Sequence, residues 1–376
     1  MDLIRIVCRE SKLSMMQAEM VKSKILALHP HKSVTITGIK SQGDRLIDVP
    51  LSQIEGMDFF TLDIYEALRS GNADIAVHSL KDMSSEHFFS HDGFAVVDRE
   101  LSHDVFIANE GIMKALTNGD EISIGTSSPR REAMVIPFLE KALPNVGHQI
   151  RLVVKSIRGN VETRLGKLHN GEFDAIILAT AGLNRLLRHH EHGKLIARYL
   201  NDKKMMILPL IECTPAPCQG LIVAECISQN IELKTLLTDI NHAQDMQEAI
   251  QHKKLALKYG SGCSQKFGVT TVKTKYAAHQ VVAGEDAVGE TIMEWTALPN
   301  PENPTNIFAT NTVMKDFFDY QWTDSQEKIL TNHVYVANPK IAKNQTLLHD
   351  ISGKVIWAAG SKTWYDLAKS GMWVTG

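Results

Sequence analysis

Residues 3–39 have the sequence LIRIVCRESKLSMMQAEMVKSKILALHPHKSVTITGI, and this stretch decides how the chain begins to fold. Residues 3–8 form an apolar, strand-like run. Ser11 then caps a predicted helix whose apolar side chains recur at helical spacing until Pro30 ends it. A second strand is predicted over residues 34–39. Strand, helix and strand in succession predict a mostly parallel sheet covered by helices.

The same alternation continues along the chain in two blocks. A polar segment around Gly43 is followed by a predicted helix over residues 59–70 and a strand over residues 74–78. A second α/β block starts near Asp104, and Pro137 is predicted to kink or break its first long helix. Its predicted strands are residues 105–108, 122–125, 151–156 and 175–180, and its helices begin at residues 128 and 160.

The sequence changes character after about residue 205. Residues 208–220 contain three prolines and predict an irregular crossing segment before a strand at residues 221–226. A helical region over residues 230–259, followed by strand-like runs, predicts a small α+β domain. Residues 299–304 are typical of a linker. The remaining segment has predicted strands at residues 333–337 and 355–359 and a helix at residues 361–370.

Composition excludes several classes of protein. The chain has 376 residues, 44% hydrophobic and 22% charged, which is typical of an ordinary folded protein of two or three domains. A formal net charge of −3 leaves no overall positive charge for nucleic-acid phosphates, so we expect no nucleic-acid partner. The apolar runs are far shorter than the roughly 20 residues of a membrane span, so we expect no membrane partner.

The cysteines favour a reducing compartment. Their number is odd, they are widely spaced, and they contain no C-x-x-C pair, so we predict a cytoplasmic protein without a disulfide framework. Residues 189–192, HHEH, are more typical of a solvated helix end than of a metal site, and no metal site is predicted. The five cysteines are Cys8, Cys213, Cys218, Cys226 and Cys263.

Six arginines stand at the start of a predicted helix or the end of a strand. Arg130 and Arg131 follow Gly125-Thr126-Ser127-Ser128, where free backbone N–H groups already favour an anion. Surface salt bridges are the alternative explanation. The repetition of this pattern in both α/β blocks favours a polyanionic ligand bound between them. The six are Arg9, Arg130, Arg131, Arg158, Arg164 and Arg185.

Two further positions could carry chemistry. Lys81 and Asp82 come directly after a buried-looking strand, where Asp82 could stabilise a developing cation or move a proton. The alternative is that Asp82 only caps the next turn. Cys263 lies in the small-residue turn GSGCS, where a thiol can be exposed and reactive, although most lone cysteines are buried and inert.

Together these motifs resemble the porphobilinogen deaminase family, also called the hydroxymethylbilane synthases. The motifs occur in the family order and cover roughly residues 1–275, so chance similarity in one motif does not explain them. The matching stretches are RIVCRESKLSMMQA from Arg5, ADIAVHSLKD from Ala73, GTSSPRRE from Gly125, KSIRGNVETRLGKL from Lys155, GEFDAIILATAGLNR from Gly171, PAPCQG from Pro215 and GSGC from Gly260.

The resemblance implies an α/β fold with two domains like type II periplasmic binding proteins, a small α+β third domain and an active-site cleft. It implies a transferase of haem biosynthesis that joins four porphobilinogen molecules, with loss of ammonia, into hydroxymethylbilane. A dipyrromethane cofactor would be held as a thioether on Cys263, and Asp82, beside Lys81, would be catalytic. The expected domains are residues 1–100 with 201–228, residues 101–200 and residues 229–300, followed by a C-terminal extension at residues 301–376.

The same resemblance assigns binding residues and a lid. The lid would span residues 44–57, where Met57 and Leu62 replace charges that the family usually carries. Residues 251–253 also depart from the family pattern, which indicates a different docking of the third domain. Substrate and cofactor carboxylates would be held by Arg9, Ser11, Ser79, Lys81, Thr126, Ser128, Arg130, Arg131, Arg158, Arg164, Arg185, Gln219 and Gly220.

The expected partner is porphobilinogen, bound by a monomer. Residues 355–371 weakly resemble uroporphyrinogen-III synthase, the next enzyme of the pathway, which is consistent with a partner of that kind or a truncated fusion. Two alternatives keep the fold without the reaction. A non-catalytic paralogue would have lost a key group, and a cytoplasmic solute-binding protein would need neither Cys263 nor Asp82.

Overall fold

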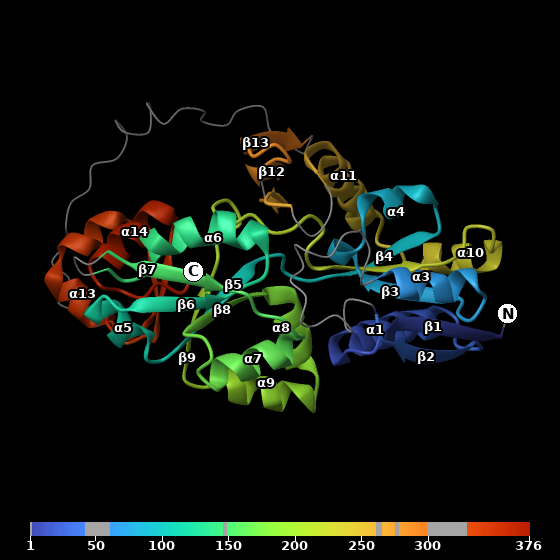
Figure 1. The fold of residues 1–376 in the computed structure, drawn as a ribbon, viewed down its shortest axis with the longest axis horizontal. Coiled ribbons are helices and arrows are strands. Elements are labelled where there is room, and N and C mark those ends of the chain that lie inside the picture. The colour runs from blue at the N-terminus through green and yellow to red at the C-terminus, as the bar shows by residue number, and fades with distance from the viewer. Residues whose placement is uncertain (1, 42–60, 146–148, 261–264, 275–277, 299–328) are drawn as a thin grey trace.

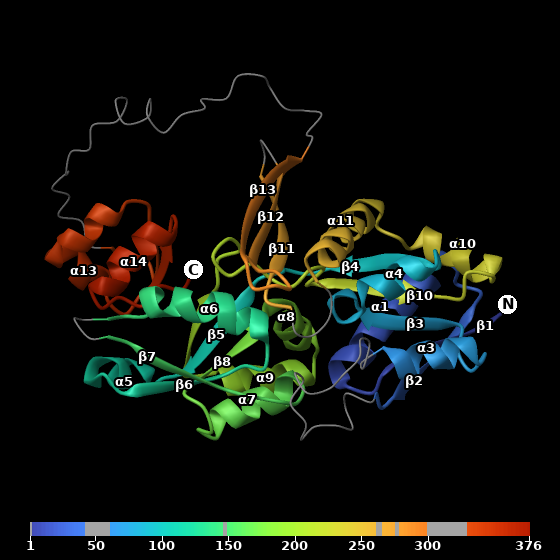
Figure 2. The same cartoon turned by 45° about the horizontal axis from the view of Figure 1, so that its top comes forward.

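Two five-stranded sheets form the body of the molecule and lie side by side as two lobes (Figure 1). A three-stranded sheet stands over their junction, and the C-terminal segment lies against the second lobe (Figure 2). The computed structural model describes residues 2–41, 61–145, 149–260, 265–274, 278–298 and 329–376. Within those ranges no helix has the length and apolar character needed to cross a bilayer.

The first lobe is a mixed sheet with the strand order β2-β1-β3-β10-β4. β1 is parallel to β2 and β3, whereas β10 is antiparallel to both β3 and β4. Ser11 caps the first helix as predicted, because its hydroxyl accepts a hydrogen bond from Ser14 N. The elements are β1 (Leu3–Arg9), α1 (Lys12–Leu28), β2 (Ser33–Ile39), α3 (Leu62–Arg69), β3 (Ile75–Ser79), η2 (Leu80–Asp82), α4 (Ser85–Ser90), β4 (Phe94–Arg99), β10 (Leu221–Glu225) and α10 (Ile231–Asp239).

The second lobe repeats this topology with the order β7-β6-β8-β5-β9. Its antiparallel strand, β5, again stands fourth and pairs with β8 and β9. In each lobe this fourth strand is the first one formed after the chain crosses from the other lobe. The elements are β5 (Asp104–Asn109), α5 (Ile112–Asn118), β6 (Glu121–Gly125), α6 (Pro129–Ala142), β7 (Arg151–Lys155), α7 (Val161–His169), β8 (Ala175–Ala179), α8 (Thr180–Arg188), α9 (His192–Leu200) and β9 (Lys203–Ile207).

The predicted α/β fold class is confirmed, and two local predictions are wrong. The first is the return to the first lobe at residue 201. β9 pairs with β5 instead, and Met206 is buried in the core of the second lobe, so the crossing back follows Ile207. The second concerns Pro137, which was predicted to kink or break its helix: α6 runs through it without a break. Phe138 and Leu139 are buried in the same core, and their packing outweighs the hydrogen bond that proline cannot donate.

The third domain joins one long helix to an antiparallel sheet. The helical region predicted over residues 230–259 is two helices, because the backbone turns away between them to bind β4. There, Val96 N donates to Asn241 Oδ1 at 2.9 Å and His242 N donates to Val96 O at 2.8 Å. The elements are α11 (Ala243–Tyr259), β11 (Gly268–Lys273), β12 (Ala278–Glu285) and β13 (Thr291–Leu298).

The C-terminal segment shares the core of the second lobe. Trp364 is buried against Phe138, and its indole Nε1 donates to Ala142 O at 3.1 Å. Thr375 connects β15 (Val355–Ala358) of the C-terminal segment to β9 of the second lobe. Its N–H donates to Ile356 O and its carbonyl accepts from Ile207 N, both at 2.7 Å. The predicted linker at residues 299–304 lies outside the described residues. The elements are β14 (His333–Val336), η3 (Pro339–Lys343), α13 (Gln345–Ile351), β15 (Val355–Ala358) and α14 (Ser361–Lys369).

Candidate active site

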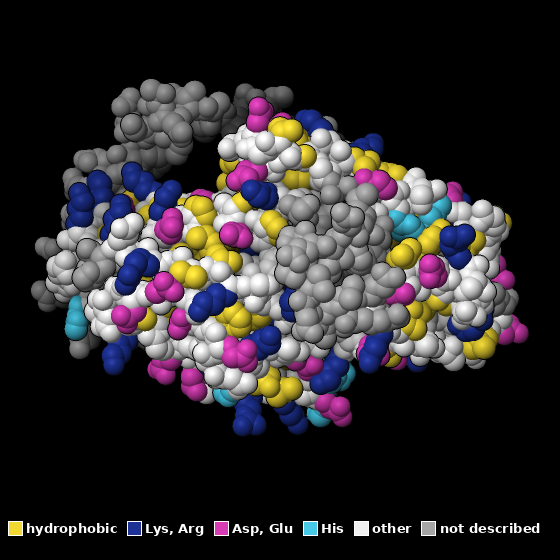
Figure 3. Space-filling view, viewed as in Figure 1, with side chains coloured by type: hydrophobic (Ala, Val, Ile, Leu, Met, Phe, Trp, Pro, Cys, Tyr) yellow, Lys and Arg dark blue, Asp and Glu magenta, His cyan; other side chains and the backbone are white. Residues whose placement is uncertain are grey.

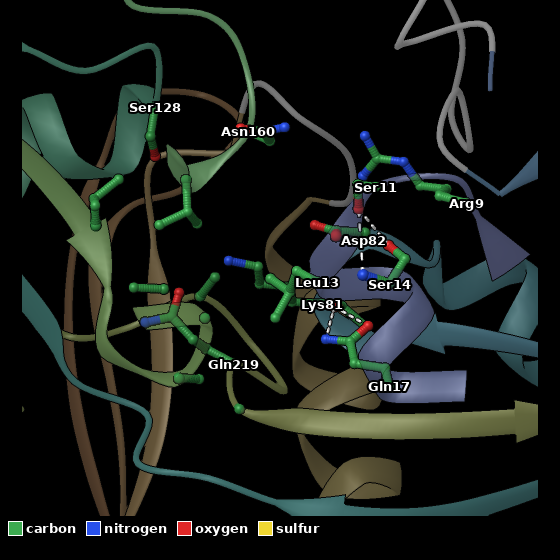
Figure 4. A pocket seen from close by; sticks show the side chains of 18 of the residues that line it. Arg9, Ser11, Leu13, Ser14, Gln17, Lys81, Asp82, Ser128, Asn160 and Gln219 are labelled. Atoms are coloured by element: carbon green, nitrogen blue, oxygen red, sulfur yellow. Dashed lines mark hydrogen bonds between the residues drawn. The ribbon is translucent and has the colours of Figure 1, made fainter. Parts of the chain in front are cut away.

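A cleft of about 840 Å³ lies between the two lobes. This volume is within the range of small-molecule sites and is large enough for a ligand of several rings. Both lobes and the third domain line it, because β1, η2, α6, α7, α8 and α11 all present residues there. Figure 4 shows Arg9, Ser11, Lys81 and Asp82 on the first lobe facing Ser128 and Asn160 on the second.

The structure brings nearly all of the predicted site residues into this cleft. Most of them converge because they follow a strand or lie near the start of a helix at the edge of a sheet that faces the other lobe. Arg185 instead comes from the last turn of α8, and Gln219 and Gly220 directly precede β10. Thr126 does not line the cleft. It is buried under the start of α6, where its hydroxyl accepts from Ser128 N at 3.3 Å. The residues that line the cleft are Arg9, Ser11, Ser79, Lys81, Asp82, Ser128, Arg130, Arg131, Arg158, Arg164, Arg185, Gln219 and Gly220.

Arg130 and Arg131 already have a carboxylate partner within the protein. Asp104, at the start of β5, is fully buried and accepts from Arg130 Nη2 at 2.7 Å and from Arg131 Nη2 at 2.8 Å. These guanidinium groups hold the pKa of Asp104 well below its usual value, against the opposing effect of burial. The sequence pattern predicted a ligand anion at this helix start, whereas the structure shows that the chain supplies one carboxylate itself. Binding of a ligand anion by these two arginines stays a prediction.

The remaining cations crowd the cleft. Burial, together with the charges of Arg131 and Arg158, lowers the pKa of Arg164 to about 10. Burial also lowers the pKa of Lys81, although neighbouring Asp82 opposes this effect. Positive charge that is partly removed from water favours an incoming anion strongly, and a guanidinium group can bind a carboxylate through two parallel hydrogen bonds.

Asp82 ends the short helix η2 directly after β3, with its side chain exposed to the cleft (Figure 4). Among the described residues, no hydrogen bond to its carboxylate is found. The next residue is anchored from the third domain, because Lys253 of α11 donates its Nζ to Met83 O. Lys253 is almost fully buried. The backbone that follows Asp82 is therefore held in place, while the Asp82 carboxylate is exposed to the cleft.

Sequence reasoning missed Lys253 as part of the site. It lies in the segment 251–253 that departs from the family pattern, and the departure was the available signal. His252, beside it, is also buried. Its Nδ1 accepts from Cys218 N at 3.1 Å, and burial lowers its pKa to about 4, so the imidazole is neutral near pH 7. Both residues join the third domain to the first lobe.

Gln219 and Gly220 tie together the two crossings between the lobes. Gln219 Nε2 donates to Ser102 O at 2.6 Å and to Asp104 Oδ1 at 3.0 Å. Gly220 has a φ of +96°, and a Cβ there would lie 2.3 Å from Glu100 O. Only glycine fits this conformation and this close approach. The two segments that cross between the lobes are therefore held against each other at the site.

Two predictions lie outside the described residues. They are the cofactor thiol Cys263 and the lid at residues 44–57, including Met57. The other cysteines are buried free thiols, and burial raises the pKa of Cys8 to about 12 and that of Cys218 to about 11. A thiol with a raised pKa is a poor nucleophile near neutral pH. Neither of these two is therefore a good candidate for covalent attachment of a ligand.

The fold and the site define a two-lobed α/β protein with an anion-binding cleft between its lobes. A family model described as "Porphobilinogen deaminase, dipyromethane cofactor binding domain" matches residues 4–235. The curated porphobilinogen deaminase of Chromobacterium violaceum is 39% identical over 273 residues, which cover 71% of this chain and 79% of that protein. The chain belongs to the porphobilinogen deaminase family.

Similarity to solved structures is more distant. A polar amino acid transporter substrate-binding protein from Streptococcus thermophilus is 15% identical with a TM-score of 0.35, covering 68% of this chain and 85% of that one. PhnD1 from Prochlorococcus marinus, solved with methylphosphonate, is 11% identical with a TM-score of 0.37, covering 64% and 83%. Because both scores are below 0.5, the fold assignment rests on the sheet topology described above.

Proposed function

We propose that the protein joins four porphobilinogen molecules, with release of ammonia, into the linear tetrapyrrole hydroxymethylbilane. Its family membership supports this reaction. The single observation that carries the site assignment is the position of Asp82, whose exposed carboxylate lies in a cleft lined by all six predicted arginines. A growing chain of pyrroles carries many carboxylates, and a cleft of about 840 Å³ lined with guanidinium groups suits such a ligand.

The arginines divide into two proposed roles. Arg130 and Arg131 share the buried Asp104, so two guanidinium charges meet one carboxylate and a net positive charge remains at the floor of the cleft. Arg158 and Arg164, on the second lobe, stand around α7 and would bind substrate carboxylates directly. Arg9 would do the same from the first lobe, so that a bound ligand bridges the lobes.

Asp82 is proposed as the catalytic carboxylate. Loss of ammonia from an aminomethylpyrrole leaves positive charge on the ring, and a carboxylate in contact with that ring stabilises the charge. The same group can accept the proton that must leave when the next ring is joined. Lys81 adjoins it, and its lowered pKa makes its ammonium a better proton donor to the leaving amine.

Cys263 is the proposed attachment point of the dipyrromethane. Gln265, two residues beyond it, lines the cleft, and so do Lys253 and Ala256 of α11. Described residues on both sides of Cys263 in the sequence therefore belong to the cleft wall. When bound, the dipyrromethane supplies the pyrrole carbon to which the first substrate is added. Its acetate and propionate groups suit the same arginine-lined surface.

Substitution of Asp82 tests this assignment. Asp82→Asn keeps the size of the side chain but removes its charge, so kcat should fall by about 10²- to 10⁴-fold in a porphobilinogen consumption assay. Asp120→Asn, an exposed carboxylate of the second lobe that does not line the cleft, is the matched control. A kcat for Asp82→Asn within threefold of wild type would remove Asp82 from its role.

The covalent assignment has a separate test. Intact mass spectrometry of the wild-type protein should show an excess the size of a dipyrromethane, together with a positive Ehrlich reaction for pyrroles. Cys263→Ala should lose both and make no bilane, whereas Cys8→Ala should retain both. Normal bilane synthesis by Cys263→Ala would contradict the thioether.

We also propose that the enzyme is a cytoplasmic monomer with the domain division predicted above, adjusted so that β9 belongs to the second domain. Four buried free cysteines support a reducing location. Light scattering of the purified protein tests the monomer. The extension, residues 329–376 of which pack on the second lobe, is proposed to bind uroporphyrinogen-III synthase, and a pull-down with the purified synthase tests this.

A further inference from the structure

Three histidines surround one buried carboxylate in the first lobe, and the proposed reaction uses none of them. Glu225 ends β10 and is fully buried. His78 comes from the neighbouring strand β3, His87 from α4, and His91 from the residue after α4. These elements enclose the loop that carries Asp82, because that loop joins β3 to α4.

The distances suit a single bound ion. Glu225 Oε1 lies 2.9 Å from His87 Nε2 and 3.5 Å from His91 Nε2. The ligand atoms of these three residues lie within 4.8 Å of one another. Bonds of about 2.0–2.1 Å at tetrahedral angles place ligand atoms roughly 3.3–3.4 Å apart. His91 Nδ1 accepts from Gly93 N at 3.2 Å, so metal binding through Nε2 requires the ring proton to move to Nδ1 and this contact to open. With that change, small adjustments of the side chains would complete three sides of a tetrahedral site.

The rings are held in this arrangement by their neighbours. His91 stacks on Phe94 with ring centroids 4.2 Å apart, and His87 packs edge-on against Tyr65 at 4.4 Å. Fixed imidazoles lose little freedom when they bind a ligand, which favours binding. Both side chains remain partly exposed, at 15% for His87 and 13% for His91. Figure 3 shows histidine side chains at the surface in the region of α4.

Several polar atoms of the cluster contact each other without a well-aligned hydrogen bond. His78 Nε2 lies 3.2 Å from Glu225 Oε2 and His91 Nε2 lies 3.5 Å from Glu225 Oε1, yet neither imidazole nitrogen nor Glu225 Oε2, all three buried, meets hydrogen-bond geometry within the described residues. Within the described part of the chain, the ion-pair partners of Glu225 are the imidazoles of His78, His87 and His91. A bound cation would add a further favourable charge beside this buried carboxylate.

We propose that His87, His91 and Glu225 bind one divalent transition-metal ion, with Zn²⁺ as the best fit. Two imidazole nitrogens and one carboxylate oxygen, with a fourth position for water, are a ligand set that Zn²⁺ uses in proteins. His78 Nε2, 3.2 Å from Glu225 Oε2, would orient the carboxylate from outside the ligand set. The ion would join α4 to β10 and brace the loop of Asp82.

Titration of the full-length holoprotein with Zn²⁺, after treatment with a chelator, tests this site. We expect one ion per chain by calorimetry, and at least tenfold weaker binding in His87→Gln and in His91→Gln. Mg²⁺ should not bind, because it prefers a shell of oxygen ligands. Co²⁺ should give visible bands without a thiolate charge-transfer band, since no cysteine belongs to the proposed ligand set.

The matched control is His189→Gln. His189 and His192 are also a close histidine pair, with ring centroids 4.5 Å apart, but they lie in the second lobe and are not part of a metal-ligand group within the described residues. This variant should bind Zn²⁺ as the wild type does. Zn²⁺ should also raise the melting temperature of the wild type and of His189→Gln, but not that of His91→Gln. Absence of stoichiometric binding, or equal affinity in the wild type and a His87→Gln/His91→Gln double variant, would overturn the proposal.

Discussion

Asp104→Asn should destabilise the protein strongly, because it leaves two buried guanidinium groups without their counter-charge. Asp104 accepts from Arg130 Nη2 at 2.7 Å, from Arg131 Nη2 at 2.8 Å and Nε at 3.2 Å, and from Gln219 Nε2 at 3.0 Å. Breaking a buried ion pair by removing one partner costs about 3–5 kcal/mol. An asparagine also turns an N–H₂ group toward at least one of these donors, so the upper part of that range applies.

This free energy converts to a large change in melting temperature. For a cooperative unit of 150–250 residues, 1 kcal/mol corresponds to about 2–4 °C, so a loss of about 4–5 kcal/mol should make Asp104→Asn melt roughly 8–20 °C below wild type. Differential scanning calorimetry measures this directly. Asp98→Asn is the control, because Asp98 is partly exposed and binds one arginine, Arg185, at 2.8 Å. The unfolding free energy of Asp98→Asn should fall by less than about 2 kcal/mol.

The same carboxylate makes stability depend on pH. The pKa of Asp104 in the folded protein lies well below its unfolded value of about 3.9. Its stabilisation is therefore fully present at neutral pH and is lost as the pH falls below about 3.9 toward the folded pKa. The unfolding free energy of wild type should fall more steeply in that range than that of Asp104→Asn. Parallel pH profiles, or an Asp104→Asn melting temperature within 2 °C of wild type, would refute the assignment of Asp104 as the internal counter-ion.

Three further substitutions test the close approach at Gly220, the hydrogen bond from Lys253 to Met83 and the packing of the C-terminal segment. Gly220→Ala should lower the unfolding free energy, measured with urea, by at least about 2 kcal/mol, because the added Cβ would meet Glu100 O. Gly71 also has a positive φ but faces open space, so Gly71→Ala should lower it by about 1 kcal/mol. Lys253→Met should lower kcat about 10- to 100-fold, because the hydrogen bond to Met83 O is lost. Lys254 is exposed, so Lys254→Met should leave kcat unchanged. Equal kcat values in the two variants would contradict a role for Lys253 in holding this loop. Trp364→Ala should lower the unfolding free energy of the second lobe by about 3–5 kcal/mol, because Trp364 is buried in its core. Trp295 is exposed, so Trp295→Ala should lower it much less. Equal losses would mean that the C-terminal segment does not share that core.

Much of the site could be predicted because local signals and topology agree. Arg158, for example, follows a strand and precedes the cap Asn160, and residues at the ends of parallel strands meet at one edge of a sheet. The gathering of arginines in one cleft therefore follows from their positions in the pattern. The capping of α1 by Ser11 was predictable for the same reason, since a cap depends on residues close in sequence.

What could not be predicted depends on contacts between distant residues. Asp104 is one aspartate among many in the sequence, and only the fold shows that it is buried beside Arg130 and Arg131. His78 and Glu225 are far apart in the chain and meet because β3 pairs with β10. Pro137 was expected from local rules to kink or break a helix, but packing of Phe138 in the core keeps the helix unbroken. Tertiary contacts decide these positions.

The place of β10 in the first sheet determines the order in which the lobes can fold during synthesis. All five strands of the second sheet come from the continuous segment 104–207, so that sheet can form as soon as this segment has left the ribosome, before the C-terminal segment that shares its core. The first sheet lacks its fourth strand until Leu221–Glu225 emerges, and β3 and β4 have no partner between them until then. The nascent chain thus carries an open, unpaired strand edge for more than a hundred residues of translation, and this is the stage at which a chaperone would protect it best.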